Sequence, residues 1–266
     1  MKILILAVTY RSYDCIGEFL NSINNASRSS DAEVVVAIGD NTDTDYQDIE
    51  YTYNNIEVRA FPYHKNLGYL GCALRMLREI CSTEAFDYVA VSNVDITLNY
   101  DFFSSLSKLN DDNVAWYAPD VYTPSRGTHE NPFMIKRPTP GTIRKWMLIY
   151  SLPLFFGFIK KLFYMKHSKN NYSESPMNIY AGHGSFMLFS WKFIKDEIDM
   201  EFPGFMYEEE LFFAEKIRRK GMTIRYSPEL KITNIGSVSV TILGNGWQCN
   251  KSKESLMKIR DLYFRQ

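Results

Sequence analysis

The sequence predicts an α/β protein built on a mostly parallel sheet. Three apolar runs, Ile3 to Val8, Glu33 to Gly39 and Phe86 to Val91, are too short for typical helices and are rich in aliphatic residues. Such runs indicate strands buried on both faces of a parallel sheet. Strands that alternate with helical stretches are typical of βαβ units, and 266 residues suffice for one large α/β domain.

The first half of the chain continues this alternation. Apolar residues at helical spacing predict a helix over 16–23, and a shorter alternating strand is expected over 56–61. A helix over about 72–81 then precedes the Phe86 strand, and a further strand is expected over 114–117. The second half is expected to contain, in order, a loop over 119–127, a strand ending near 190, a helix from about 205 to 220 stopped by Gly221, short strands over 223–226 and 230–233, and a helix over 251–266.

Polar side chains follow three of the predicted parallel strands. They are Thr9 and Arg11, Asp40 and Asn41, and Asn93 and Asp95. Because the carboxyl ends of parallel strands meet at one edge of a sheet, these groups are expected to surround one crevice. There they can hold a nucleobase, a ribose diol and a cation.

Asp95 stands at a strand end beside an amide and a hydroxyl, which suits a hard divalent cation together with phosphates. It therefore predicts a metal-diphosphate anchor, although an Asp that caps a helix over 100–109 fits this stretch equally well. Asp40 likewise has an alternative, because DNTDTD is also typical of an Asx turn.

Three consecutive acids, Glu208 to Glu210, follow an aromatic residue where a helix is expected to begin. The helix dipole favours acids there, but adjacent carboxylates repel one another and raise one another's pKa. Such an arrangement supplies a general base.

The charge is unevenly distributed. A net charge of -1 and a pI near 6.4 argue against nucleic-acid binding, yet 131–173 contains no Asp or Glu and eight Lys or Arg residues. Its apolar run is too short to span a bilayer and contains Pro153. Basic clusters around aromatic and aliphatic residues indicate peripheral contact of 136–169 with an anionic membrane; the alternative is an amphipathic helical insertion packed on its own domain.

The four cysteines show no CxxC spacing, which indicates reduced thiols in a cytosolic protein. The N-terminal apolar run lacks a small-residue cleavage site and is better interpreted as the first strand than as a signal sequence.

Six short motifs occur in order along the chain. They are VTYRS from Val8, GDN from Gly39, NLGY from Asn66, NVD from Asn93, GSFM from Gly184, and FMYEEE from Phe205 with 216–221. Their order and spacing, from Ile3 to about Ser239, resemble the family 2 glycosyltransferases of the GT-A fold. The similarity is to bacterial rhamnosyltransferases and to capsular and O-antigen sugar transferases.

The resemblance implies one GT-A domain over 1–266, with a Rossmann-like mixed, mostly parallel sheet flanked by helices. Its parts would be a nucleotide-binding half (1–117), a loop and basic, aromatic helical insertion (118–178), and an acceptor-side half with a C-terminal helix (179–266). It implies a metal-dependent, inverting enzyme of bacterial surface polysaccharide synthesis. The donor would be a UDP-, dTDP- or GDP-sugar and the acceptor a glycan, lipid-linked at the cytoplasmic membrane face.

The family's site residues carry over to matching positions. Thr9 and Asp40 would hold base and ribose, with Arg11 nearby; Asp95 would ligate Mg2+ or Mn2+; Glu209 or Glu210 would be the base. The remaining donor-binding positions would be Asn41, Asn66, Gly68 and Asn93. Asn234 stands where relatives commonly have a His, and its side-chain oxygen is the second expected metal ligand.

Two other functions remain open. A nucleotidyltransferase shares the sheet and the metal but would have a Gly-rich, basic loop after the first strand, which TYRS at 9–12 does not provide. A non-catalytic, glycosyltransferase-like binding partner is favoured by Asn234.

Overall fold

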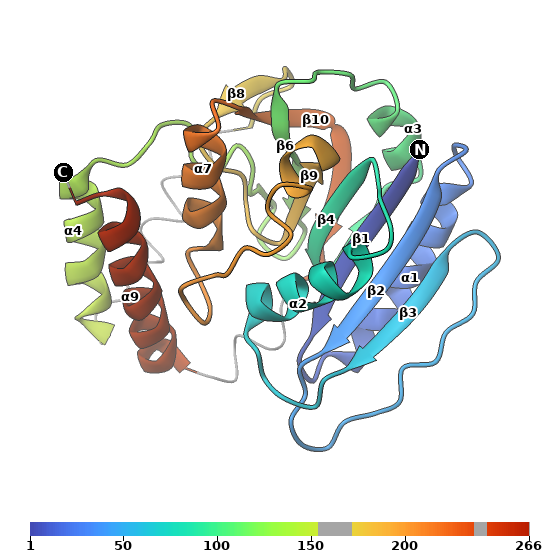
Figure 1. Ribbon diagram of the computed structural model, residues 1–266, viewed down its shortest axis with the longest axis horizontal. Helices are drawn as coiled ribbons and strands as arrows, with labels where there is room; N and C mark the ends of the chain where they lie inside the picture. The colour runs from blue at the N-terminus through green and yellow to red at the C-terminus, as the bar shows by residue number, and fades with distance from the viewer. Residues whose placement is uncertain (154–171, 237–243, 266) are drawn as a thin grey trace.

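A ten-stranded mixed sheet forms the centre of the computed structural model, which describes residues 1–153, 172–236 and 244–265 (Figure 1). The main strand order is β3-β2-β1-β4-β9-β6-β10-β5, with β7 paired to β6 and β8 to β10. Helices cover both faces, so the predicted α/β class is confirmed.

The element bounds agree with most of the predicted alternation. The strands are β1 (Lys2–Thr9), β2 (Glu33–Asp40), β3 (Glu57–Pro62), β4 (Tyr88–Asn93), β5 (Ile96–Leu98), β6 (Val114–Thr123), β7 (Thr128–His129), β8 (Met177–Ile179), β9 (Phe186–Ser190) and β10 (Thr223–Asn234). The helices are α1 (Tyr13–Ser27), α2 (Tyr69–Cys81), α3 (Phe102–Leu106), α4 (Pro140–Tyr150), α6 (Trp191–Ile194), α7 (Glu209–Arg219) and α9 (Gly244–Tyr263).

The first four strands form a parallel sheet, in which β1 lies between β2 and β4 and β3 pairs with β2. The register places Thr9 opposite Asp40 and Val8 opposite Asn93, so the carboxyl ends of these strands meet at one edge as expected. Beyond β4 the sheet becomes mixed, because β9 runs antiparallel to both β4 and β6.

Successive residues of β1 belong to two different cores. Ile3, Ile5 and Ala7 pack with α1 and α3, whereas Leu4 and Leu6 pack on the other face with α2, α7 and α9. Since side chains alternate across a strand, a continuous apolar run is what a strand with helices on both faces requires.

Three predicted boundaries are wrong. β6 continues through Pro119 to Thr123, where a loop was expected; the carbonyl of Pro119 accepts a hydrogen bond from Asn131 Nδ2 at 2.8 Å. The two short strands predicted around Pro228 form the single strand β10, with a register shift against β6 between Ser227 and Lys231. α9 begins at Gly244, ahead of the apolar stripe from which it was predicted.

The described part of the basic insertion is mainly α4. Thr139 Oγ1 accepts a hydrogen bond from the Thr142 N–H at 3.1 Å and caps the helix, and Ile143 is buried. α4 lies beside α9 (Figure 1), and Arg260 Nη1 contacts Met147 Sδ at 3.6 Å. Part of 136–169, from residue 154 onward, lies outside the described residues. Across the described ranges, the helices are too short or too polar to cross a bilayer.

α7 is anchored by a fully buried carboxylate. Glu215 accepts hydrogen bonds from Arg137 Nε (2.6 Å), Tyr180 Oη (2.8 Å) and Arg218 Nη2 (3.0 Å). Burial alone would raise the pKa of Glu215, but these donors outweigh burial and lower it. The ionised group therefore fixes α7 against the segment that leads into α4.

Candidate active site

Asp40 and Thr9 lie side by side at the edge of the parallel sheet. The Asn41 N–H donates to Thr9 O at 2.9 Å, and Thr9 Oγ1 is buried without a hydrogen-bond partner among the described residues. Asp40 Oδ1 accepts from the Thr42 N–H (2.9 Å) and Oδ2 accepts from Tyr13 Oη (2.7 Å). The Asx turn weighed from the sequence is therefore present, and it fixes the carboxylate where a ribose was expected.

Asn41 and Gly68 connect the end of β2 to the segment that precedes α7. The Asn41 side chain donates to Gly68 O at 2.9 Å and accepts from the Leu67 N–H at 3.3 Å. Gly68 has a φ of 75°, and a Cβ there would lie 2.0 Å from Phe205 O. Both residues thus have structural roles, in addition to the predicted donor contacts. Asn66 Oδ1 accepts from the Gly68 N–H at 3.0 Å and completes this loop.

Arg11 is exposed and has a left-handed backbone, with a φ of 57°. Its N–H donates to Thr42 Oγ1 at 3.0 Å, and its guanidinium reaches Thr44 Oγ1 at 2.5 Å and Asp43 at 3.5 Å. The β1 and β2 loops are therefore tied together above Asp40.

Asp95 lies between β4 and β5, so it is not a helix cap; α3 begins at Phe102. It is 5% exposed, and its Oδ1 has no hydrogen-bond partner among the described residues. Burial raises the pKa of Asp95, against lowering contributions from its own backbone N–H and from the Asn93 side chain. A buried oxygen that no hydrogen bond satisfies costs free energy unless a ligand completes its contacts.

The predicted metal ligands are neighbours in the sheet. Asn234 pairs with Ile96, and the Ile235 N–H donates to Asp95 O at 3.0 Å. Asn234 Oδ1 itself accepts from the Gly236 N–H at 3.0 Å. No group of three or more His, Cys, Asp or Glu side chains arranged for a metal occurs in the described ranges. The orphaned Asp95 oxygen fits a cation that takes few protein ligands and completes its shell with phosphate oxygens.

The turn at His183 to Ser185 connects Asp95 to the predicted base. The Asn93 N–H donates to Ser185 O at 3.0 Å, and the Gly184 N–H donates to Glu210 Oε1 at 3.1 Å. A Cβ on Gly184 would lie 2.5 Å from that same oxygen, so glycine is needed for this approach. The His183 ring bonds Ser185 Oγ at 2.9 Å.

Tyr69 lies against the turn that binds Glu210. Its hydroxyl donates to Gly184 O at 3.0 Å. Burial raises the pKa of Tyr69 well above its usual value, and the charges of Glu209, Glu210 and Asp95 raise it further. Asp95 is distant in sequence from the adjacent pair Glu209 and Glu210, yet all three carboxylates raise the pKa of this one phenol.

The acidic turn before α7 has a strained backbone. Tyr207 and Glu208 have φ values of 68° and 70°, which residues with a Cβ adopt only at a cost of about 1–3 kcal/mol each. Glu209 Oε1 accepts from the Tyr207 N–H at 2.9 Å, and Ser255 Oγ donates to Met206 O at 2.8 Å. Tertiary contacts thus hold the turn in place.

The three glutamates of this turn differ in environment. Burial raises the pKa of Glu208 to about 8, against the hydrogen bond that Tyr150 Oη donates to it at 2.8 Å. Burial also raises the pKa of Glu209 well above its usual value, with a further contribution from Glu210. Glu210 is partly exposed.

No family model matches the sequence, and no curated protein matches it. Among solved structures, the chain is similar to GalNAc-T7 bound to UDP, GalNAc and Mn2+, with a TM-score of 0.59 over 98% of this chain and 10% identity. The chain has the GT-A fold. It is also similar to S. aureus TarS, with a TM-score of 0.50 over the whole chain and 15% identity. It spans 48% and 44% of those two chains, which is about half of their length.

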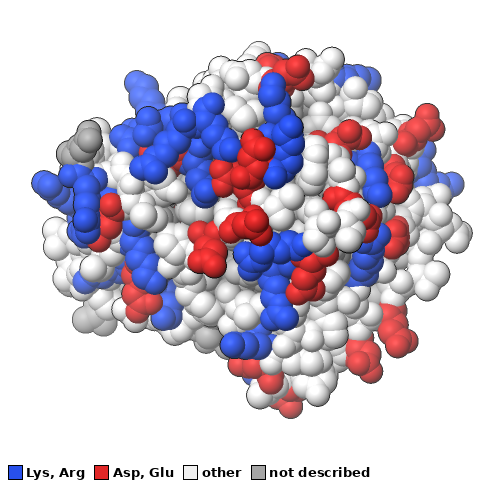
Figure 2. Space-filling model, viewed as in Figure 1, with Lys and Arg blue, Asp and Glu red and all other residues white. Residues whose placement is uncertain are grey.

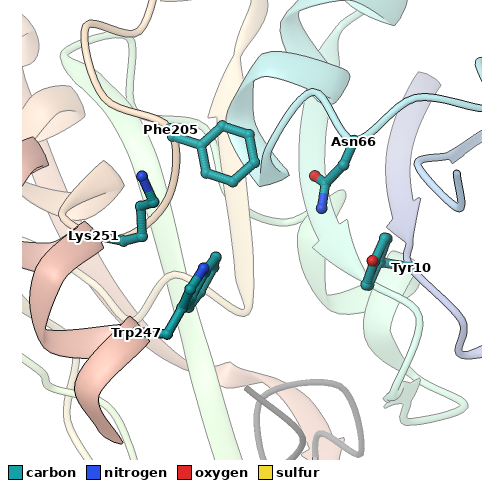
Figure 3. Close-up of a pocket in the computed structure, with 5 residues that line it drawn as sticks. All are labelled: Tyr10, Asn66, Phe205, Trp247 and Lys251. Atoms are coloured by element: carbon teal, nitrogen blue, oxygen red, sulfur yellow. The ribbon is translucent and has the colours of Figure 1, made fainter. Parts of the chain in front are cut away.

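Sequence reasoning missed several residues of this GT-A site. Tyr69 stands in the NLGY motif but was given no role, and Tyr150 lies on α4, far from any motif. Phe205 was seen only as part of FMYEEE. A cavity of about 330 Å³ opens beside this segment, lined by Tyr10, Asn66, Phe205, Trp247 and Lys251 (Figure 3). Nothing in the sequence signalled Trp247.

Glu208→Gln should change how stability depends on pH. Between the usual pKa of 4.5 and about 8, the unfolded chain ionises this group while the folded protein keeps it protonated. Glu208 should therefore lower the wild-type free energy of unfolding over this window, by at most ~1.4 kcal/mol per pH unit for this one group, and its contribution should level off above the window. Gln mimics the protonated acid and should not show this loss.

Urea unfolding of both proteins at pH 5, 6, 7 and 8 measures the difference. Glu254→Gln, on the exposed face of α9, is the matched control and should follow the wild type. Parallel curves for wild type and Glu208→Gln would contradict the assignment.

Proposed function

We propose that the protein is an inverting, metal-dependent glycosyltransferase that moves a sugar from a nucleotide donor to a glycan hydroxyl. The proposal is carried by the turn at 183–185, where Ser185 O accepts from the Asn93 N–H at 3.0 Å and the Gly184 N–H donates to Glu210 Oε1 at 3.1 Å. This turn links the end of the strand before Asp95 to Glu210, beside the edge formed by Thr9 and Asp40. The arrangement supports a diphosphate anchor and a base around one crevice of a GT-A fold.

Glu210 is the better candidate for the base. A base must reach the acceptor hydroxyl and be ionised when it takes the proton. Glu209 is buried, its Oε1 is committed to the Tyr207 N–H, and burial keeps its pKa high. Glu210 is partly exposed, and the Gly184 N–H orients its Oε1.

The donor would be a UDP-, dTDP- or GDP-sugar. Thr9 and Asp40 would hold its nucleoside, and Asp95 would hold Mg2+ or Mn2+ with the diphosphate. When bound, the cation supplies positive charge that stabilises the leaving diphosphate. Glu210 would take the proton from the acceptor oxygen as that oxygen attacks the anomeric carbon, so no covalent enzyme intermediate is needed.

The acceptor is proposed to be lipid-linked, in surface polysaccharide synthesis, and α4 to contact the cytoplasmic face of the membrane. One face of α4 and the residues after it is exposed and carries Arg144, Lys145, Leu148 and Leu152, at helical spacing. Basic side chains are attracted to anionic lipid headgroups, and neighbouring leucines can insert into the apolar boundary of the membrane. Figure 2 shows Lys and Arg gathered on the side of the molecule where α4, α7 and α9 lie. The opposite face of α4 packs on α9, as expected for a helix packed on its own domain, and this packing leaves the exposed face available for the proposed membrane contact.

Asp95→Asn should weaken metal-dependent nucleotide binding by at least about tenfold, because even outer-shell metal partners are worth about 10- to 100-fold. Calorimetric titration with UDP, dTDP and GDP, with and without Mn2+, measures this. Asp101→Asn makes the same chemical change on an exposed residue and should bind like the wild type. Unchanged affinity in Asp95→Asn would remove the anchor.

Glu210→Gln should reduce donor turnover by about 10²- to 10⁴-fold while sparing nucleotide binding, since a general base acts only on the chemical step. Glu209→Gln should lose less donor turnover than Glu210→Gln. Nucleotide release from the donor reports turnover. Full activity in Glu210→Gln would exclude it as the base. If the wild-type protein binds nucleotide but does not turn over the donor, the non-catalytic binding partner is favoured. If it releases pyrophosphate when given a nucleoside triphosphate and a sugar phosphate, the nucleotidyltransferase is favoured.

Arg144→Glu with Lys145→Glu should lower binding to anionic vesicles by at least about tenfold, since each basic residue near such a surface contributes about 1 kcal/mol. Co-sedimentation with phosphatidylglycerol and phosphatidylcholine vesicles measures it. Lys192→Glu with Lys195→Glu is the matched control, with the same charge reversal on the exposed side of α6. Equal loss in both double variants would show that only net charge matters.

A further inference from the structure

The cavity of about 330 Å³ has two walls of different origin. Tyr10 follows β1 and Asn66 precedes α2, so both belong to the donor side. Phe205 belongs to the segment that leads to Glu210, and Trp247 and Lys251 come from α9. Figure 3 shows Phe205, Trp247 and Lys251 facing Asn66 and Tyr10 across the gap. A molecule in this space would therefore lie between the proposed donor loops and the segment that leads to Glu210.

The wall on the base side is aromatic. The rings of Tyr207 and Trp247 meet edge to face, with centroids 6.2 Å apart, so Trp247 is positioned by a residue of the strained turn itself. The faces of aromatic rings are large, apolar and negatively polarised. They suit the C–H-rich face of a sugar ring, whose hydroxyls can then point to polar groups such as Asn66. The volume is at the lower end of the range for small-molecule sites.

Five of the described residues line the cavity, and Lys251 is the charged one among them. Its ammonium lies 5.8 Å from the centroid of the Phe205 ring and 2.8 Å from Glu254 Oε2. The Glu254 side chain is 49% exposed, so solvent weakens its hold on Lys251. The ammonium remains able to attract a negative group on a ligand.

We propose that this cavity is the acceptor subsite and binds the terminal sugar of the acceptor, with the ring stacked on Phe205 and Trp247 and an acidic substituent beside Lys251. The inference rests on the proposed function. The acceptor, rather than the donor, is assigned to the aromatic wall because this wall is continuous with the base segment, and a base must reach the acceptor hydroxyl.

Two probes test the subsite, octyl glucuronide and octyl glucoside, which differ in a carboxylate at C6. Their binding is followed by saturation-transfer NMR and titration, in the presence of Mn2+ and the nucleoside diphosphate that binds best. The wild type should bind both and prefer the glucuronide several-fold. Trp247→Ala should weaken both several-fold, while Trp247→Phe, which keeps an aromatic face, should retain most of the binding.

Lys251→Gln should abolish the preference for the glucuronide and leave glucoside binding unchanged. Lys253→Gln is the matched control, since it removes the same charge from α9 at a residue that does not line the cavity. Failure of the wild type to bind either probe, or wild-type binding in Trp247→Ala, would overturn the subsite. A preserved preference in Lys251→Gln would overturn the acidic acceptor.

Nucleotide titrations on the same samples separate this inference from the proposed function. Trp247→Ala should bind nucleoside diphosphate like the wild type; if it loses nucleotide together with sugar, the wall belongs to the donor and the inference fails. If the wild type binds no nucleotide, the proposed function fails, whereas sugar binding that depends on Trp247 still identifies the cavity as a carbohydrate site.

Discussion

The site depends on one close approach of backbone to backbone, between Gly68 and the carbonyl of Phe205. A Cβ added to Gly68 would lie 2.0 Å from that oxygen, so a residue with a side chain does not fit there. The φ of 75° at Gly68 also favours glycine. Asn41 fixes the backbone of Gly68 from the donor side, and Phe205 leads to the acidic turn. Main-chain contact therefore fixes the β2 edge, which carries Asp40, relative to the segment that leads to the proposed base, and such contact is far less deformable than contact between flexible side chains.

The two ends of α7 treat buried carboxylates in opposite ways. Near the carboxyl end, Glu215 receives hydrogen bonds from two arginines and a tyrosine, and its pKa is lowered. At the amino end, Glu208 and Glu209 have few donors, and burial raises their pKa values. A buried carboxylate whose burial is offset by hydrogen bonds and positive charges stabilises the fold. Buried carboxylates with too few such partners destabilise it and are typical of functional sites. Glu215 and Asp95 differ in the same way, because the pKa of Glu215 is lowered by its donors whereas the pKa of Asp95 is raised by burial.

The N-terminal parallel strands could be predicted from the sequence, because hydrophobic periodicity and the residues at strand ends are local properties of the chain. The apolar runs located β1, β2 and β4, and parallel pairing then brought Thr9 and Asp40 together. The sequence could not predict features that depend on contacts between distant parts of the chain. The strain at Tyr207 and Glu208 is maintained by distant partners such as Ser255 on α9, and no local pattern encodes a left-handed Glu. The extension of β6 through Pro119 likewise depends on a neighbouring strand.

Helices α4 and α9 both contact the acidic turn that precedes α7. Tyr150, at the end of α4, donates to Glu208, and Trp247, on α9, packs against Tyr207. The helix proposed to meet the membrane and the helix proposed to meet the acceptor therefore contact adjacent residues of one strained turn. A strained segment persists only while its surroundings hold it. The contacts from α4 and α9 therefore help to hold the turn from which Glu210 reaches the Gly184 N–H.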